Sequence, residues 1–156
     1  MYFSEPVTAL TDYALGAASL YFAIALQQRE FPKSRSVHLW SLGFFSSAAA
    51  AFIGGTFHAL KFHASDSVLN VLWNLTIVSI GAAGAFMGSG VMVSSINRHH
   101  KSRPWLWGGV WVTAAGSLIQ QTGIPLHNDI FHCTQILALY LFFSGARLLE
   151  DRVPPG

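Results

Sequence analysis

The sequence predicts an all-α, polytopic integral membrane protein: a five-transmembrane-helix bundle that forms one domain over residues 1–156. The first observation is composition, since 52% of the residues are hydrophobic and only 10% are charged, whereas a soluble domain carries roughly 25% charged residues. The second is a set of five apolar runs, each long enough to cross about 30 Å of hydrocarbon as a helix of roughly 20 residues. The third is the one-sided distribution of basic residues between those runs.

The five runs follow one another with short polar connections. Pro6 stands at a natural first-turn position for the first helix. Pro104 and Pro125 mark the turns on either side of the fourth helix, because proline interrupts helical hydrogen bonding. The third run is the longest, and tilt in the bilayer would absorb its excess length. The predicted spans are residues 7–26, 39–60, 68–93, 105–124 and 130–149.

Lysine and arginine set the predicted orientation. Lys61 is the one basic residue in the connections predicted on its side of the membrane. Because cytoplasmic loops carry the excess of basic residues, the N-terminus is predicted outside and the C-terminus in the cytoplasm. The chain is therefore expected to be a multi-pass protein of the bacterial inner membrane or an equivalent membrane. The eight basic residues of the cytoplasmic side are Arg29, Lys33, Arg35, Arg98, Lys101, Arg103, Arg147 and Arg152.

With this orientation, the strongly polar residues within or beside the spans all fall in the outer half of the membrane. The inner half is composed of Leu, Ala, Phe, Ile and Gly. Ionisable groups cost several kcal/mol in a bilayer unless they are paired, bind a metal or face a polar cavity. The pattern therefore predicts one polar pocket that opens outward. Its candidate residues are Glu5, Asp12, His58, Asn70, Asn74, Gln121, His127, Asp129 and His132.

These residue types are compatible with a catalytic zinc ion, which usually takes three protein ligands and a water. His58 and His132 are the first ligand candidates, with His127, Asp129, Asp12 or Glu5 as the third. Zinc would lower the pKa of bound water toward 7 and polarise a carbonyl, which predicts hydrolysis of a lipid-like amide or ester. Asp129, Asp12 and Asn74 are the predicted catalytic residues, and Glu5, Asn70 and Gln121 are predicted to line the substrate pocket.

Three alternatives use the same residues. The polar layer could be a hydrogen-bonded structural network, or it could bind a pigment or haem or form part of an ion path. A non-catalytic accessory or ligand-binding subunit of a larger membrane complex is the rival function. Gly84 and Gly88 have the GxxxG spacing that permits close helix packing within one chain or between subunits. The expected partners are membrane lipids and a homo-oligomer or larger complex, and the near-neutral charge argues against nucleic acid.

Three segments resemble the alkaline ceramidase and Per1-like proteins of the CREST superfamily. SEPVTALTDY resembles the segment that opens the first helix of that group. FIGGTFHALKF resembles the segment around its first zinc histidine, which corresponds to His58. NDIFHCTQILALYLF resembles its last helix, where the second histidine of H-x-x-x-H corresponds to His132. The resemblance covers about a third of the chain and implies zinc-dependent intramembrane hydrolysis.

The chain departs from that pattern at three positions and in length. The family's serine, four residues before the first histidine, corresponds to Gly54, and its aspartate in the next helix corresponds to Asn70 or Asn74. The first histidine of H-x-x-x-H corresponds to Asn128, beside His127. The family has seven spans and this chain has five predicted ones. The resemblance therefore implies either machinery rebuilt with His127, Asp129 or Asp12, or a non-catalytic relative.

Overall fold

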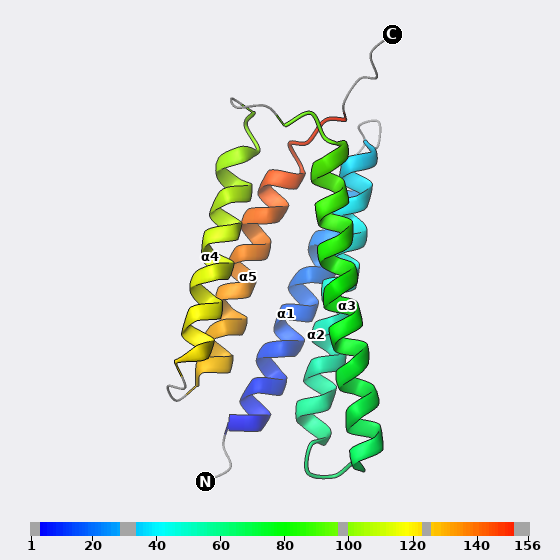
Figure 1. Cartoon of the computed structure of the whole chain (residues 1–156), viewed down its shortest axis with the longest axis vertical. Helices are drawn as coiled ribbons and strands as arrows, with labels where there is room; N and C mark the ends of the chain where they lie inside the picture. Colours follow the sequence, from blue (N-terminus) through cyan, green and yellow to red (C-terminus); the bar gives the residue numbers. More distant parts are fainter. Residues whose placement is uncertain (1–3, 29–33, 97–99, 123–125, 152–156) are drawn as a thin grey trace.

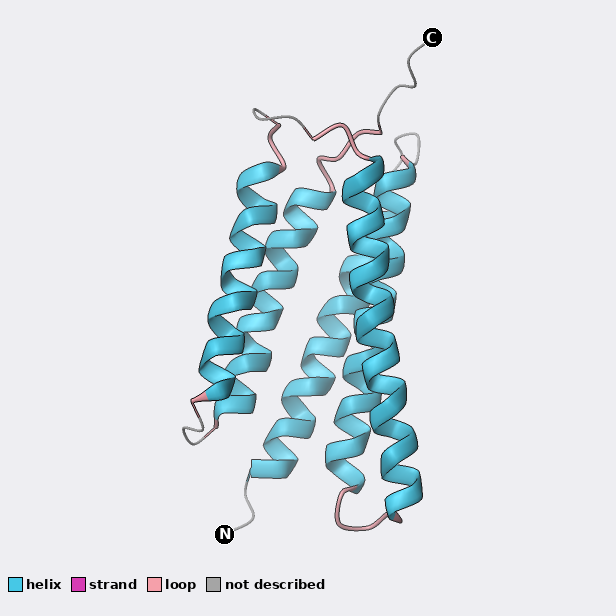
Figure 2. Ribbon diagram, in the orientation of Figure 1, coloured by secondary structure: helices cyan, strands magenta, loops and turns pink. Residues whose placement is uncertain are grey.

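The computed structural model contains five α-helices that run alternately up and down the long axis of the molecule (Figures 1 and 2). It describes residues 4–28, 34–96, 100–122 and 126–151. The prediction of an all-α fold with five helices is confirmed. The helices are α1 Ser4–Gln27, α2 Arg35–Leu60, α3 Asp66–Val93, α4 Arg103–Gln121 and α5 His127–Ala146.

The helix boundaries differ from the prediction by a few residues: each helix begins two to four residues earlier than predicted, whereas α4 and α5 each end three residues earlier. Helix α2 begins at Arg35 rather than at residue 39, since Ser34 accepts the Val37 N–H and caps it. Helix α5 begins at His127 rather than at residue 130. The polar residues just before the predicted span, 127–129, are therefore part of the helix, which places Asp129 and His132 on its first two turns.

Packing arranges the helices in the order α3, α2, α1, α5, α4. Helices adjacent in this row contact each other, and α5 also approaches α2. Over the described residues, α3 packs only on α2 and α4 only on α5. Figure 1 shows the α4–α5 pair standing beside the α1–α3 group, with α1 nearest to α5. The two ends of the row, α3 and α4, are therefore not in contact with each other.

Three of the five helices are long and apolar enough to cross a membrane: residues 6–27 of α1, together with α2 and α3. Helices α4 and α5 are shorter, with 19 and 20 residues, and they contain part of the polar layer: Gln121 in α4, and His127, Asp129 and His132 in α5. Length and apolar character thus support membrane association for the α1–α3 group. The predicted orientation and the fourth and fifth spans stay predictions.

The alternation of helix direction gathers the described basic residues at one end of the bundle. Arg35, Lys101, Arg103 and Arg147 lie where α2 and α4 begin and α3 and α5 end, whereas Lys61 follows α2 at the opposite end (Figure 1). We call the end with Arg35, Lys101, Arg103 and Arg147 the basic end, and the end with Lys61 the polar end. Four further basic residues of the prediction lie outside the described residues: Arg29, Lys33, Arg98 and Arg152.

The hydrophobic core lies toward the basic end. Phe22 of α1 stacks on Phe143 of α5 with ring centroids 5.0 Å apart and contacts Phe44 of α2 edge-on at 5.7 Å. Leu26 and Trp40 are buried in the same cluster. These aromatic contacts join α1, α2 and α5 in the predicted inner half. The polar residues therefore lie at the other end of the same three-helix interface.

Glycines bring α2 close to α1 near the polar end. A Cβ atom at Gly55 would lie 3.0 Å from the Tyr13 ring and 3.1 Å from Asp12 Cβ, which is tighter than a methyl group usually tolerates. Gly54 lies beside the Asp12 carboxylate, since a Cβ atom at this position would be 3.6 Å from Oδ2. By contrast, Gly84 and Gly88 of α3 have open space at their Cβ positions. The α2 glycines thus serve packing within the chain, and the α3 pair does not.

Candidate functional site

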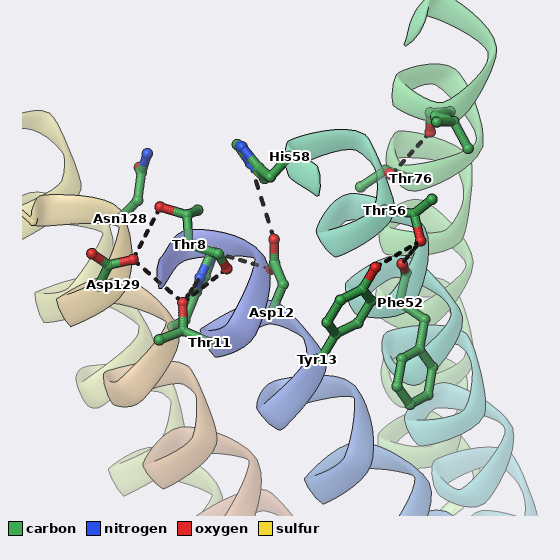
Figure 3. Close-up of polar contacts among 12 residues, drawn as sticks. Thr8, Thr11, Asp12, Tyr13, Phe52, Thr56, His58, Thr76, Asn128 and Asp129 are labelled. Atoms are coloured by element: carbon green, nitrogen blue, oxygen red, sulfur yellow. Dashed lines mark hydrogen bonds and ion pairs between the residues drawn. The ribbon is translucent and has the colours of Figure 1, made fainter. Parts of the chain in front are cut away.

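Three helices each contribute one ionisable side chain to a cluster at the polar end. Asp12 of α1 stands in the middle. Its Oδ1 lies 3.2 Å from Nε2 of His132 on α5, and its Oδ2 lies 4.0 Å from Nε2 of His58 on α2. Figure 3 shows the Asp12 carboxylate directed toward His58. The structure thus brings together an aspartate and two histidines that are 46 and 74 residues apart along the chain.

A second aspartate joins the cluster through two threonines of α1. Thr8 donates a hydrogen bond of 3.0 Å to Asp129 Oδ1, and Thr11 Oγ1 lies 3.4 Å from the same oxygen. Thr11 Oγ1 is also 2.9 Å from His132 Nδ1. Asp129 therefore connects to His132 through the Thr11 hydroxyl, and Figure 3 shows both threonines directed toward Asp129. Among the described residues, the second oxygen of Asp129, Oδ2, is buried and has no hydrogen-bond partner.

The cluster is shielded from the surroundings. Thr8 and Asp129 are buried, and the side chains of Asp12 and His132 are 9% and 10% exposed, whereas the His58 side chain is 19% exposed. Buried ionisable groups are retained only when hydrogen bonds or opposite charges compensate for lost solvation. The α1 threonines and the carboxylate–imidazole pairs supply that compensation. His58 is the member of the Asp12–His58–His132 cluster that is most accessible from outside.

The surroundings of His132 suit both of its protonation states. In the neutral form, an Nε2–H can donate to Asp12 while Nδ1 accepts the Thr11 hydroxyl proton. In the imidazolium form, Nδ1–H can donate to Thr11 Oγ1, whose own proton then turns to the Thr8 carbonyl oxygen at 3.0 Å or to Asp129. Because Thr11 has one proton and several acceptors, it can switch without any movement of the backbone. The hydrogen bonds of Thr11 can therefore adjust to either protonation state of His132.

An apolar groove of about 650 Å³ runs along α1 and α2 at the polar end and is lined in part by His58. This volume lies within the range of roughly 300–1,000 Å³ that small-molecule sites occupy. Tyr13 lines the groove, and its hydroxyl is 3.3 Å from Thr56 Oγ1. Figure 3 shows Tyr13 beside Asp12. The lining residues are Pro6, Ala9, Leu10, Tyr13, His58, Ala59, Phe62 and His63.

The described side chains do not assemble the predicted zinc site. Ligand atoms around a tetrahedral zinc ion, each about 2.0–2.2 Å from the metal, lie roughly 3.3–3.6 Å apart. The separation between Asp12 and His132 is close to that range, but the separation between Asp12 and His58 exceeds it. No group of three His, Cys, Asp or Glu side chains in the described part of the chain is placed to hold a metal ion. The described residues thus give no support for zinc.

The other predicted site residues lie around this cluster rather than in it. Asn70 and Asn74 of α3 and Gln121 of α4 are exposed. His127 is the first residue of α5, five positions before His132, and therefore projects from a different face of the helix. The side chain of Glu5 lies outside the described residues. The roles predicted for these five residues stay predictions.

Thr8 shares a polar stripe of α1 with Glu5 and Asp12, but neither Thr8 nor Thr11 is among the predicted site residues. Thr8 is four residues before Asp12 and shares its face of α1, whereas Thr11 directly precedes Asp12 and projects about 100° away from it around the helix. The signal was the segment T-x-x-T-D within an apolar helix, since such hydroxyls either bond back to their own helix or reach a polar group on a neighbour. The sequence does not decide between these two outcomes.

The chain belongs to a protein family, DUF6962, described as a family of unknown function, whose model matches residues 7–99 and 88–151. These matches cover all five helices and include Thr8, Asp12, His58, Asp129 and His132. No curated protein and no solved structure matches the chain.

Proposed function

We propose that this protein is a membrane-embedded hydrolase that cleaves a lipid-like amide or ester at the Asp12–His58–His132 cluster. The observation that carries the proposal is the position of His58. Its imidazole lines an apolar groove and also faces the buried carboxylate of Asp12. An accessible imidazole backed by a buried carboxylate is a common arrangement for general-base catalysis.

The groove would hold an acyl chain or similar apolar part of the substrate, with its carbonyl near His58. His58 would accept a proton from a water molecule as the water oxygen attacks the carbonyl carbon. Asp12 would stabilise the resulting imidazolium, and the same proton would then pass to the leaving nitrogen or oxygen as its bond to the carbonyl carbon breaks. Water supplies both the hydroxyl of the acid product and the proton of the leaving group, so no other reactant is needed.

The remaining groups have supporting roles in this scheme. His132 would fix the position of Asp12 through the 3.2 Å contact, and Thr11 would accommodate changes in the protonation of His132.

The proposal includes membrane passage of all five helices. Exposed large apolar side chains support this, since Trp111 and Leu118 of α4 are 70% and 65% exposed and Leu137 of α5 is 50% exposed. Contiguous exposed apolar surface of this kind is rare on soluble monomers. The basic end would lie in the cytoplasm, so that the cluster and its groove face the outer leaflet.

Hydrolysis of fluorogenic long-chain amides and esters by detergent-purified protein tests the proposal. His58→Ala should reduce turnover by about 10²–10⁴-fold, the usual contribution of general-base catalysis. His38→Ala is the matched control, because His38 is an exposed histidine at the other end of the same helix. Equal turnover in both variants, or no hydrolysis of any such substrate by the wild type, would overturn the proposal.

Zinc stays a separate prediction, and metal analysis of the purified protein tests it. If zinc contributes, the wild type should contain about one ion per chain, and both His58→Ala and His132→Ala should lose it. Absence of zinc from a folded, active wild type would contradict the zinc prediction and leave the His58–Asp12 scheme unchanged.

A non-catalytic role in a larger complex is the second candidate, and one observation favours it. Gly84 and Gly88 of α3 have the spacing of a helix-packing motif, yet within the described residues no atom of another side chain or helix lies within 4 Å of their Cβ positions. A helix of a second protein could approach this face closely. In that case the polar cluster would only hold α5 against α1. Folded protein that copurifies with a stoichiometric partner and lacks hydrolytic activity would support this role.

A further inference from the structure

A second cavity, of about 530 Å³, lies near the basic end and is separate from the candidate hydrolytic site. Its walls are α3 and α4, the two helices at opposite ends of the row that do not contact each other in the described structure. Met87 and Gly88 line it from α3, Leu106 and Trp107 from α4, and Trp40 and Phe142 form its floor. Arg103, at the start of α4, also lines it.

We propose that this groove binds one anionic phospholipid of the cytoplasmic leaflet, with an acyl chain between α3 and α4 and the phosphate at Arg103. The apolar walls fit an acyl chain. The guanidinium fits a phosphate, which arginine can bind through two parallel hydrogen bonds. Arg103 also lies at the basic end, where Arg35, Lys101 and Arg147 add positive charge, and basic residues near the membrane surface favour anionic lipids.

Gly88 allows a clean test, because space is open at its Cβ position and it lines the groove. Gly88→Leu should fold normally and fill the groove. Gly84→Leu is the matched control, since Gly84 has equally open space one turn away on α3 and does not line the groove. Arg103→Gln removes the charge at the phosphate position, and Lys101→Gln removes a nearby charge from a residue outside the groove.

Native mass spectrometry of the detergent-purified full chain, with added phosphatidylglycerol or phosphatidylcholine, measures the bound lipid. The wild type, Gly84→Leu and Lys101→Gln should retain one phosphatidylglycerol per chain and prefer it to phosphatidylcholine. Arg103→Gln should lower that preference by about fivefold, the effect of one basic residue near an anionic surface. Gly88→Leu should retain neither lipid. Equal retention in Gly88→Leu and Gly84→Leu, no preference in the wild type, or a second copy of the chain held in the groove would overturn the proposal.

Discussion

At the residue scale, the cluster depends on where a few short side chains direct their protons. Thr8 and Thr76 are both buried threonines, 3% and 6% exposed, on helices that meet α2. The Thr76 hydroxyl returns its proton to Leu72 of its own helix, whereas Thr8 donates across to Asp129 of α5. The Thr76 hydroxyl therefore forms a bond only within its own helix, whereas the Thr8 hydroxyl joins α1 to α5.

Replacement of Thr8 by valine should therefore be more costly than the same change at Thr76. Thr8→Val leaves the buried Asp129 carboxylate short of a donor, which costs about 1–3 kcal/mol. Thr76→Val should cost less than about 1 kcal/mol, because the hydroxyl only supplements an existing helical bond. Unfolding in detergent measures both, and Thr8→Ser should restore the stability. Equal losses in the two valine variants would show that the Thr8 hydrogen bond does not hold α5.

The sequence predicts the ionisable members of the cluster but not their pairing. Each of the four ionisable residues interrupts or borders an apolar run, where an unpaired ionisable group would cost free energy in a membrane. These residues are Asp12, His58, Asp129 and His132. Which carboxylate faces which imidazole depends on the rotation of three helices about their axes. That rotation is fixed by contacts such as Gly55 against Tyr13, which the sequence does not reveal.

At the scale of the helices, the chain after α5 caps the start of α2. The Asp151 carboxylate accepts the backbone N–H of Arg35 at 2.5 Å and that of Ser36 at 2.8 Å. Burial alone would raise the pKa of Asp151, but the hydrogen bonds from Ser36 and Arg35 and the nearby Arg35 charge lower it overall. Together with Ser34, this carboxylate satisfies three of the N–H groups that a helix start leaves without partners.

Asp151→Ala should lower the free energy of unfolding by about 0.5–2 kcal/mol, the usual effect of losing a helix cap. Because the folded-state pKa is lowered, the stabilisation is complete above the unfolded-state pKa of about 4 and disappears as pH falls through the folded value. The difference between wild type and variant, measured by unfolding from pH 7 down to pH 3, should therefore shrink toward the acid end. A difference that grows on acidification would contradict this role. Glu150→Ala is the control, since Glu150 contacts Ser95 through its backbone oxygen.

At the scale of the whole molecule, five helices and their approximate bounds could be read from apolar runs and prolines. The order α3, α2, α1, α5, α4 could not, because every run is similarly apolar and the connections are short enough for many arrangements. The positions of small residues do not predict the packing order of the helices either. The α2 glycines pack within the chain, whereas Gly84 and Gly88 are open. The groove between α3 and α4 exists only because of this order.

Single-cysteine labelling in intact cells tests the proposed orientation. In a Cys133→Ser background, a cysteine at Lys61 should react with a membrane-impermeant maleimide added outside. A cysteine at Lys101 should react only after the membrane is permeabilised, because the two residues lie at opposite ends of the bundle (Figure 1). The reverse pattern would place the cluster at the cytoplasmic side and overturn the proposal of an outer-leaflet substrate.

The most direct test of the hydrolytic site is the turnover of a folded Asp12→Asn variant on a substrate that the wild type cleaves. Asparagine keeps the size of the side chain and an acceptor for His132, so the contact between α1 and α5 should persist and the melting temperature should stay close to that of the wild type. The charge that supports a His58 imidazolium is removed. Turnover should fall by about 10²-fold or more while the fold is retained. Wild-type turnover in the folded variant would contradict the catalytic role of the cluster and leave it as a structural link between helices.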